Sequence, residues 1–277
     1  MRIAIIGDVH EQWGAEDLAY FESEDFDLVL FVGDLPSFSH LNTERVARAI
    51  SGIRSPAILI PGNHDATTPV QVLAEAVQVG CELDRWARAQ TRRVERLRDA
   101  LGRVPLGGYS VHSVGIVDII ACRPHAMDGR FLSFKPYLLD RFGVGDREAS
   151  GQRLKGCVDR CTNPIIFLSH NGPAGLGGTR DDLFGRSKPE FDNGDPDLTE
   201  AIAYARQTGH VVLASAAGHM HHQGDGGARR WTVERDGIRY INAARVPRVF
   251  QRNGRSYRHC VELIVNGDRT VVREILY

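Results

Sequence analysis

Carboxylate, imidazole and amide side chains gather at five places in the sequence, each directly after a short apolar segment. In chain order the groups are Asp8 and His10; Asp34; Asn63, His64 and Asp65; His170; and His219 and His221. Nitrogen and oxygen ligands of these kinds, with no thiolate among them, suit Mn, Fe, Zn or a similar divalent ion. The set is too large for one ion, but it suits two ions that share a bridging carboxylate. Two ions held about 3.5–4 Å apart can clamp the attacking and the leaving oxygen of a phosphoester.

The apolar segments before these groups are predicted to be strands that are buried on both faces. They are short, rich in β-branched residues and almost continuously apolar. The segments are residues 3–6, 28–32, 57–60, 165–169 and 211–215. In open sheets that mix strands and helices, ligands bind beyond the carboxyl ends of the strands, where all five groups lie. Glycines that let the backbone turn sharply accompany four of the groups. These are Gly7, Gly33, Gly62 and Gly218.

The other regular patterns predict antiparallel hairpins and three helices. Strands that alternate or are more polar are predicted at residues 111–121, 230–234, 238–242, 259–265 and 270–276. Turn sequences at residues 235–237 and 266–268 separate two pairs of them. Helical spacing of apolar side chains predicts helices at residues 43–50, 83–101 and 197–208. Arginines line the opposite face of the second helix, and a solvated face is favoured over a surface for an anionic partner.

The whole chain, residues 1–277, is interpreted as one domain, because a chain of this length can bury one substantial core. Two segments, residues 128–159 and 172–196, show weak patterns and are interpreted as surface segments near the site. Residues 66–110 and 172–196 are expected to be insertions that form walls around the site.

Composition and charge restrict the partners that are expected. The 34 Lys and Arg residues balance 35 Asp and Glu residues, and a net charge of -1 holds neither nucleic acid nor an anionic membrane non-specifically. No apolar stretch approaches a membrane span or a signal-peptide core. The five cysteines, from Cys81 to Cys260, are scattered and suggest reduced thiols. We therefore expect a cytoplasmic protein without a membrane partner. The ligand groups described above, rather than the composition, point to a small-molecule or nucleotide phosphoester as the substrate, and the oligomeric state is not indicated.

Taken together, the motifs resemble those of a known enzyme family. The chain is similar to the calcineurin-like metallophosphoesterases in the motifs Asp8-x-His10, Gly33-Asp34, Gly62-Asn63-His64-Asp65, His170 and Gly218-His219-x-His221. These motifs look like the full signature of the superfamily and run over most of the chain. Two further stretches resemble a poorly characterised branch of the superfamily. They are His170-Asn171-Gly172-Pro173 and Gly194-Asp195-Pro196-Asp197-Leu198.

The resemblance implies a fold and a set of metal ligands. The fold is an α/β sandwich of four layers, α/β/β/α, in which two mixed β-sheets pack face to face with helices outside. Two divalent metal ions are implied, with Mn²⁺ as the first choice and Fe, Zn or Ni as alternatives. One ion would be bound by Asp8, His10 and His221, and the other by Asn63, His170 and His219. Asp34 would bridge the two ions.

The resemblance also implies the reaction. A hydroxide held between the ions would attack phosphorus in line and hydrolyse a phosphomonoester or phosphodiester, while the ions neutralise charge on the phosphoryl oxygens. His64 would be catalytic rather than a ligand, because it would bind a phosphoryl oxygen or protonate the leaving alkoxide. Asp65 is predicted to orient His64 or a ligand histidine. The sequence does not indicate which residues bind the rest of the substrate.

Structural roles compete with each of these interpretations. Asp8 or Asp34 alone could cap a helix, and His170 alone could be a core histidine, but together the motifs favour the metal site. His222 and Arg123 are left out of the site, since His222 is expected to be exposed or to support a ligand, and Arg123 could contact a phosphate or form a structural salt bridge.

Two functions are alternatives to hydrolysis of a small phosphoester: a non-catalytic metal-binding scaffold of the same fold, and a nuclease. The complete ligand set disfavours the first, and the balanced charge disfavours the second.

Overall fold

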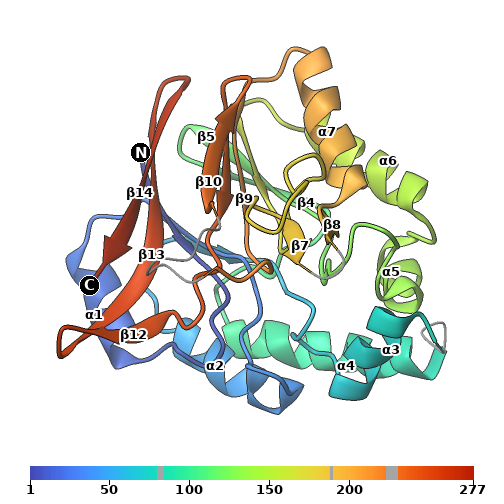
Figure 1. Ribbon diagram of the computed structural model, residues 1–277, viewed down its shortest axis with the longest axis horizontal. Coiled ribbons are helices and arrows are strands. Elements are labelled where there is room, and N and C mark those ends of the chain that lie inside the picture. The colour runs from blue at the N-terminus through green and yellow to red at the C-terminus, as the bar shows by residue number, and fades with distance from the viewer. Residues whose placement is uncertain (80–83, 188–189, 223–229) are drawn as a thin grey trace.

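The structure, a computed structural model, describes residues 1–79, 84–187, 190–222 and 230–277 (Figure 1). Predictions that concern Leu83, Cys81 and the side chain of Arg85 lie outside the described part of the chain. The predicted architecture of two mixed sheets flanked by helices is confirmed. Figure 1 shows the two sheets in the middle of the molecule, with the N- and C-termini on the same side.

The first sheet combines the N-terminal strands with the C-terminal hairpins. Its strand order is β12-β13-β1-β2-β3, and β14 also pairs with β13. The strands are β1 (Arg2–Ile6), β2 (Leu28–Phe31), β3 (Ala57–Leu59), β12 (Val249–Arg252), β13 (Arg255–Asn266) and β14 (Arg269–Leu276). The first three strands run parallel, and β13 is antiparallel to β1, with Ile3 opposite Leu263. The carboxyl ends of β1, β2 and β3 therefore share one edge of the sheet.

The second sheet has the order β10-β11-β9-β6-β5-β4. Its strands are β4 (Ser110–Val114), β5 (Val117–Ala121), β6 (Ile165–Leu168), β9 (Val212–Ala217), β10 (Thr232–Arg235) and β11 (Ile238–Asn242). The four inner strands run parallel, and the outer strands β4 and β10 are antiparallel to their neighbours. The segment 111–121, which we predicted as one strand, is the hairpin β4–β5, because Gly115 adopts a positive φ of 57° between them.

Alternation along the strands divides the apolar side chains between two cores. In β1, Ile3 and Ile5 belong to the core that includes the second sheet, whereas Ala4 and Ile6 pack with helices on the outer side of the first sheet. This outer core contains side chains of α1 (Ala15–Ser23), α2 (Thr43–Ile50) and α4 (Asp84–Leu101). On the far side of the second sheet lie α6 (Arg147–Val158) and α7 (Pro196–Gln207) (Figure 1). The period-two pattern thus produces four layers.

The helix predictions agree with α2, α4 and α7 in position. Gln90, Val94 and Leu97 on α4 are buried, whereas Arg88 and Arg92 are exposed, which agrees with a largely solvated arginine face. Arg93 is the exception on that helix, since its guanidinium donates to the carbonyl of Ala66 at 2.6 Å. The helix α3 (Pro69–Val77) lies in the predicted insertion 66–110.

Two segments that we interpreted as surface segments contain regular structure. Residues 128–159 include α5 (Lys135–Phe142) and α6, and Leu138 and Leu154 on these helices are fully buried. Residues 172–196 include the ribbon β7 (Gly185–Ser187) and β8 (Glu190–Asp192), and Phe184 is fully buried beside it. The apolar spacing in both segments is interrupted by charged and glycine residues, which is why it was missed. None of the helices in the described part of the chain has the length and apolar character that a bilayer crossing requires.

Candidate metal centre

Three predicted ligands meet beyond the ends of β1 and β9. Oδ2 of Asp8 lies 2.9 Å from Nε2 of His221 and 3.8 Å from Nε2 of His10. The two Nε2 atoms are 3.2 Å apart. Because the three ligand atoms all lie within 4.8 Å of one another, they can share one divalent ion. His221 is partly exposed and Asp8 is fully buried, so this cluster opens towards solvent on the histidine side.

The remaining predicted ligands form a second cluster. One ligand atom each of Asp34, His170 and His219 lies within 4.8 Å of the others. Nε2 of His170 is 2.9 Å from Oδ1 of Asn63 and 3.4 Å from Oδ2 of Asp34. The structure therefore brings all the predicted ligands together, although the bridging role of Asp34 stays a prediction.

Backbone hydrogen bonds join the two clusters. The backbone N–H of His219 donates to Oδ1 of Asp8 at 3.1 Å, and the N–H of His10 donates to the carbonyl of Asp34 at 2.9 Å. Asp8 and Asp34 leave the first sheet, whereas His219 and His170 leave the second. The centre is therefore assembled at the junction of the two sheets.

The backbone at the centre is held in unusual conformations. The φ angles of His10, Asp34 and His219 are 45°, 49° and 66°, a left-handed region that few residues other than glycine adopt. Such strain persists where the surrounding structure holds it, and it is common at functional sites. In this protein it occurs at three of the predicted ligands, and it turns the chain sharply as it leaves the strands.

The buried carboxylates of Asp8 and Asp34 attract positive charge into the centre. Oδ2 of Asp8 is buried, and Nε2 of His221 and Nε2 of His10 lie 2.9 Å and 3.8 Å from it. His170 donates from Nδ1 to the carbonyl of Val32 at 2.6 Å, which leaves Nε2 facing the oxygens of Asn63 and Asp34. Burial alone lowers the pKa of His170, but the charge of Asp34 and its hydrogen bond raise it to about 10. A metal ion satisfies the same nitrogen and oxygens, so the donor set fits one.

His64 lies beside both clusters without joining either. Its backbone N–H donates to Oδ1 of Asp34 at 2.8 Å, and the centre of its ring is 6.5 Å from that of His10. Nδ1 of His64 is buried and has no hydrogen-bond partner in the described part of the chain. The exposed ring of Phe38 is also near His64, with its centre 6.3 Å from that of the His64 ring. The position of His64 agrees with a residue that faces a substrate.

The prediction that Asp65 orients a histidine is wrong. Its carboxylate is fully buried and accepts the backbone N–H groups of Leu35 at 2.9 Å and Gly62 at 2.8 Å. It thereby ties the loop that carries Asp34 to the loop that carries Asn63. Short carboxylates often bind nearby backbone in this way, and sequence alone does not separate that role from one on a histidine.

The two residues that we left out of the site have structural contacts. His222 is buried, and Nε2 of its ring lies 3.2 Å from the carbonyl of Asn242. Arg123 is buried in ion pairs with Asp195 at 2.5 Å and Asp197 at 3.0 Å. The structural salt bridge is thus the alternative that the structure favours for Arg123.

Asn242 supports the site and was not identified from the sequence. It is fully buried at the end of β11, and its Nδ2 donates to the carbonyl of Met220 at 2.7 Å. Met220 lies between His219 and His221, so the contact holds the loop that contributes to both clusters. The only signal was an asparagine at the end of a predicted strand, which is also typical of turns.

Gly62 leaves no room for a side chain. A Cβ atom there would lie 2.3 Å from Oδ1 of Asp34 and 2.6 Å from Cε1 of His170. We expect Gly62→Ala to lose about 1–3 kcal/mol of unfolding free energy, as overpacked interiors do, and to bind metal more weakly. Chemical denaturation and metal titration measure the two effects. Gly156→Ala on α6 is the control, because a Cβ there meets nothing within 4 Å. Wild-type metal affinity in Gly62→Ala would contradict this packing.

Comparisons with known proteins agree with the fold. The family model described as calcineurin-like phosphoesterase matches residues 1–242. A solved structure from Thermus thermophilus, the protein TT1561, is 12% identical, with 98% of this chain and 97% of that chain covered and a TM-score of 0.54. A hypothetical protein from the same organism is 13% identical, with 100% and 99% covered and a TM-score of 0.50. At such identities the likeness shows the fold alone. No curated protein matches the sequence.

Proposed function

Since the chain belongs to the calcineurin-like phosphoesterase family, we propose that it hydrolyses a phosphomonoester or phosphodiester with the help of two divalent metal ions. The observation that carries this proposal is the pair of adjacent ligand clusters, each with ligand atoms within 4.8 Å of one another, beside the buried Nδ1 of His64. Asp8, His10 and His221 would hold one ion, and Asn63, His170 and His219 the other. Asp34 would contact both.

The residues of the chain have distinct tasks in this proposal. When bound, the two ions would generate a nucleophile from water near neutral pH and neutralise charge on the phosphoryl group. The buried carboxylates of Asp8 and Asp34 fix the position of positive charge, and the hydrogen bond from His170 to Val32 fixes the orientation of the His170 ring. His64 would donate a hydrogen bond to a phosphoryl oxygen or a proton to the leaving alkoxide. We propose Mn²⁺ as the working metal, and Fe, Zn or Ni are alternatives that the same nitrogen and oxygen ligands accept.

A phosphoester panel with several metals tests this function. We expect purified protein stripped with a chelator to be inactive, and protein reconstituted with Mn²⁺ to bind two ions and cleave an aryl phosphate or an aryl diester. The rates with Fe, Zn and Ni identify the preferred metal, and mononucleotides and cyclic nucleotides against non-nucleotide esters identify the substrate class. Two bound ions with no turnover across the panel would instead favour a metal-binding scaffold. Fewer than two ions would contradict the proposal.

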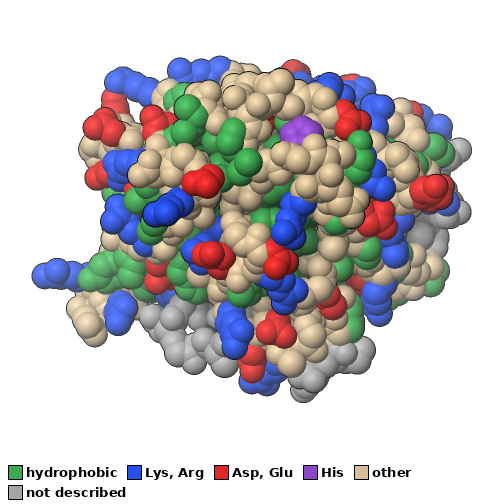
Figure 2. All heavy atoms as spheres, turned by 90° about the horizontal axis from the view of Figure 1, so that it is seen from above, with side chains coloured by type: hydrophobic (Ala, Val, Ile, Leu, Met, Phe, Trp, Pro, Cys, Tyr) green, Lys and Arg blue, Asp and Glu red, His purple; other side chains and the backbone are tan. Residues whose placement is uncertain are grey.

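Nuclease activity has less support than hydrolysis of a small phosphoester. The face of the molecule in Figure 2 carries Lys and Arg side chains mixed with Asp and Glu, rather than a continuous basic surface. A duplex bound through its phosphates requires several such basic contacts. Salt-sensitive binding and cleavage of DNA strands by the reconstituted protein would revive this alternative.

We also propose that the whole chain forms one domain and works in the cytoplasm. Support for one domain comes from the C-terminal strand β13, which pairs with β1 at the other end of the chain. The cysteines in the described residues, Cys122, Cys157, Cys161 and Cys260, are buried and free, which agrees with a reducing compartment.

A further inference from the structure

A short loop after β5 carries two buried side chains that are not among the predicted ligands. Arg123 is 3% exposed and His125 is fully buried. The loop begins where β5 ends, at the same edge of the second sheet from which His170 emerges after β6. A buried arginine and a buried histidine both need partners, and the contacts of these two residues run in different directions.

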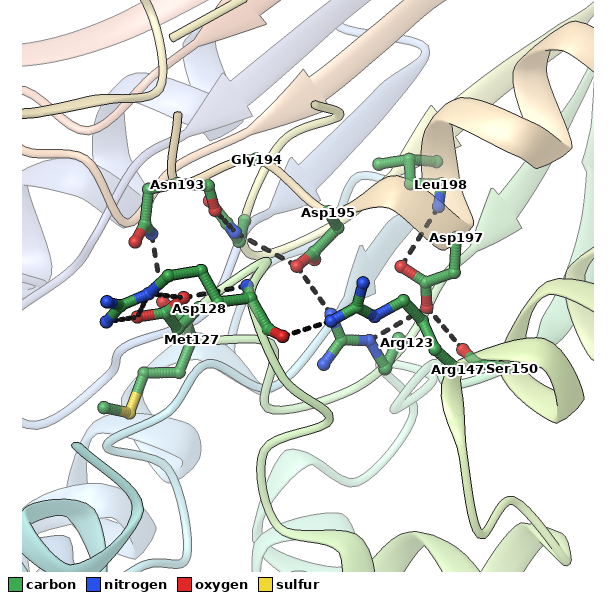
Figure 3. Close-up of polar contacts among 12 residues, drawn as sticks. Arg123, Met127, Asp128, Arg147, Ser150, Asn193, Gly194, Asp195, Asp197 and Leu198 are labelled. Atoms are coloured by element: carbon green, nitrogen blue, oxygen red, sulfur yellow. Dashed lines mark hydrogen bonds and ion pairs between the residues drawn. The ribbon is translucent and has the colours of Figure 1, made fainter. Parts of the chain in front are cut away.

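The contacts of Arg123 lead to the residue that follows His170. Figure 3 shows the guanidinium of Arg123 between the carboxylates of Asp195 and Asp197. Oδ1 of Asp195 also accepts a hydrogen bond from Nδ2 of Asn171 at 3.2 Å, and this Nδ2 atom donates to the carbonyl of Asn193 at 2.7 Å. A backbone hydrogen bond joins the same two segments, since the N–H of Asp195 donates to the carbonyl of Gly172 at 2.7 Å. Arg123 therefore fixes the segment on which His170 is carried.

The contacts of His125 lead to the residue that precedes Asn63. Its backbone N–H donates to the carbonyl of Pro61 at 2.8 Å, and its ring donates from Nδ1 to the carbonyl of Gly62 at 2.8 Å. Burial lowers the pKa of His125 to about 4, so the ring is neutral and Nδ1 carries the single proton that the carbonyl requires. Tyr137 packs edge-on against this ring, with the ring centres 5.1 Å apart, and holds its orientation.

The contacts of Arg123 and those of His125 lead to the same pair of predicted ligands. Asn63 comes from the first sheet and His170 from the second, and Oδ1 of Asn63 is 2.9 Å from Nε2 of His170. In the described part of the chain, no hydrogen bond or ion pair joins Arg123 or His125 to the other cluster, which contains Asp8, His10 and His221. The loop thus spans the sheets at the second cluster alone.

We propose that Arg123 and His125 are positioning residues that hold Asn63 and His170 in register as ligands of the second metal ion. This inference rests on the proposed function, because it requires that two ions bind. Stability alone does not explain why Arg123 is buried in ion pairs, since a buried ion pair generally contributes little net stability compared with apolar residues of similar volume. Supporting contacts of metal ligands typically change metal affinity by about 10–100-fold when they are removed.

Stepwise Mn²⁺ titration of two variants tests the inference. Arg123→Lys keeps the charge but not the planar fork that reaches two carboxylates, and His125→Phe keeps an aromatic ring but not the hydrogen bond to Gly62. We expect each variant to bind the first Mn²⁺ with wild-type affinity and the second about 10–100-fold more weakly. At limiting Mn²⁺, we expect the electron paramagnetic resonance spectrum of the wild-type protein to be that of a coupled pair of ions. Under the same conditions, we expect the spectrum of each variant to be that of single ions. His125→Asn, which can donate to Gly62 and tolerates the positive φ of 56°, is expected to recover part of the loss.

The control lies at the other end of the same strand. Asp118, at the start of β5, is buried and accepts the backbone N–H groups of Thr162 and Asn163 at 2.8 Å. Asp118→Asn is expected to lower the unfolding temperature without changing either affinity for Mn²⁺. The inference is overturned if both variants keep wild-type affinity for the second ion, or if the control weakens it equally. If Arg123→Lys does not fold, His125→Phe decides the question. Wild-type protein that binds fewer than two ions overturns the proposed function, and this inference with it.

Discussion

Replacement of Asp34 by asparagine is expected to reduce phosphoesterase activity by about 10³-fold or more, because a metal centre contributes several kcal/mol to the stabilisation of the transition state. Asparagine keeps the shape of the side chain, so Oδ1 can still accept the backbone N–H of His64, which is 2.8 Å away in the wild type. It removes the negative charge that faces His170 at 3.4 Å. If Asp34 contacts both ions, the variant is expected to retain fewer than two Mn²⁺ per chain.

Metal analysis, activity and thermal unfolding of the metal-free protein together measure this prediction. The matched control is Glu262→Gln, which alters a fully buried carboxylate on β13 that pairs with Arg2 at 2.7 Å and lies in the first sheet, away from the candidate centre. The control is expected to lose stability and to keep its metal and its activity. Full activity with two bound ions in Asp34→Asn would remove Asp34 from the centre. Loss of folding in the metal-free variant would mean that the carboxylate is needed for the fold.

The sheets and the ligand positions could be predicted because both depend on local pattern. Continuous apolar runs such as residues 28–32 identify strands that are covered on both faces, and polar residues directly after them must lie at the sheet edge. Parallel strands then bring Asp8 and Asp34 to one edge, although they are distant in the sequence. The resemblance to a family added the pairing of ligands into two clusters, which no local pattern contains.

The supporting contacts could not be predicted, because they depend on how loops from different sheets pack. Asp65 has the residue type and position of a partner for His64, yet the closest donors in the fold are the backbone N–H groups of Leu35 and Gly62. Arg123 was ambiguous for the same reason, since its partner Asp195 is distant in the sequence and lies in a segment with little regular pattern. Side-chain chemistry limits the partners that a residue accepts, and the tertiary fold selects among them.

Replacement of His64 by alanine is expected to reduce kcat by about 10²–10⁴-fold, the range of general acid catalysis, while two Mn²⁺ remain bound. The side chain of His64 belongs to neither ligand cluster, and its backbone N–H, which bonds to Asp34, is present in alanine too. The variant therefore separates turnover from metal binding, in contrast to Asp34→Asn. Metal analysis and steady-state rates on the same preparation measure both quantities.

The dependence on the leaving group distinguishes the two tasks proposed for His64. If it protonates the leaving alkoxide, His64→Ala is expected to slow an alkyl phosphoester far more than a nitrophenyl ester, because nitrophenolate departs without a proton. If it only binds a phosphoryl oxygen, both substrates are expected to slow equally. His210→Ala, at the amino end of β9 on the opposite edge of the second sheet, is the control expected to leave both rates unchanged. Wild-type turnover in His64→Ala, or loss of metal from it, would contradict the assignment of His64 as a catalytic residue that is not a ligand.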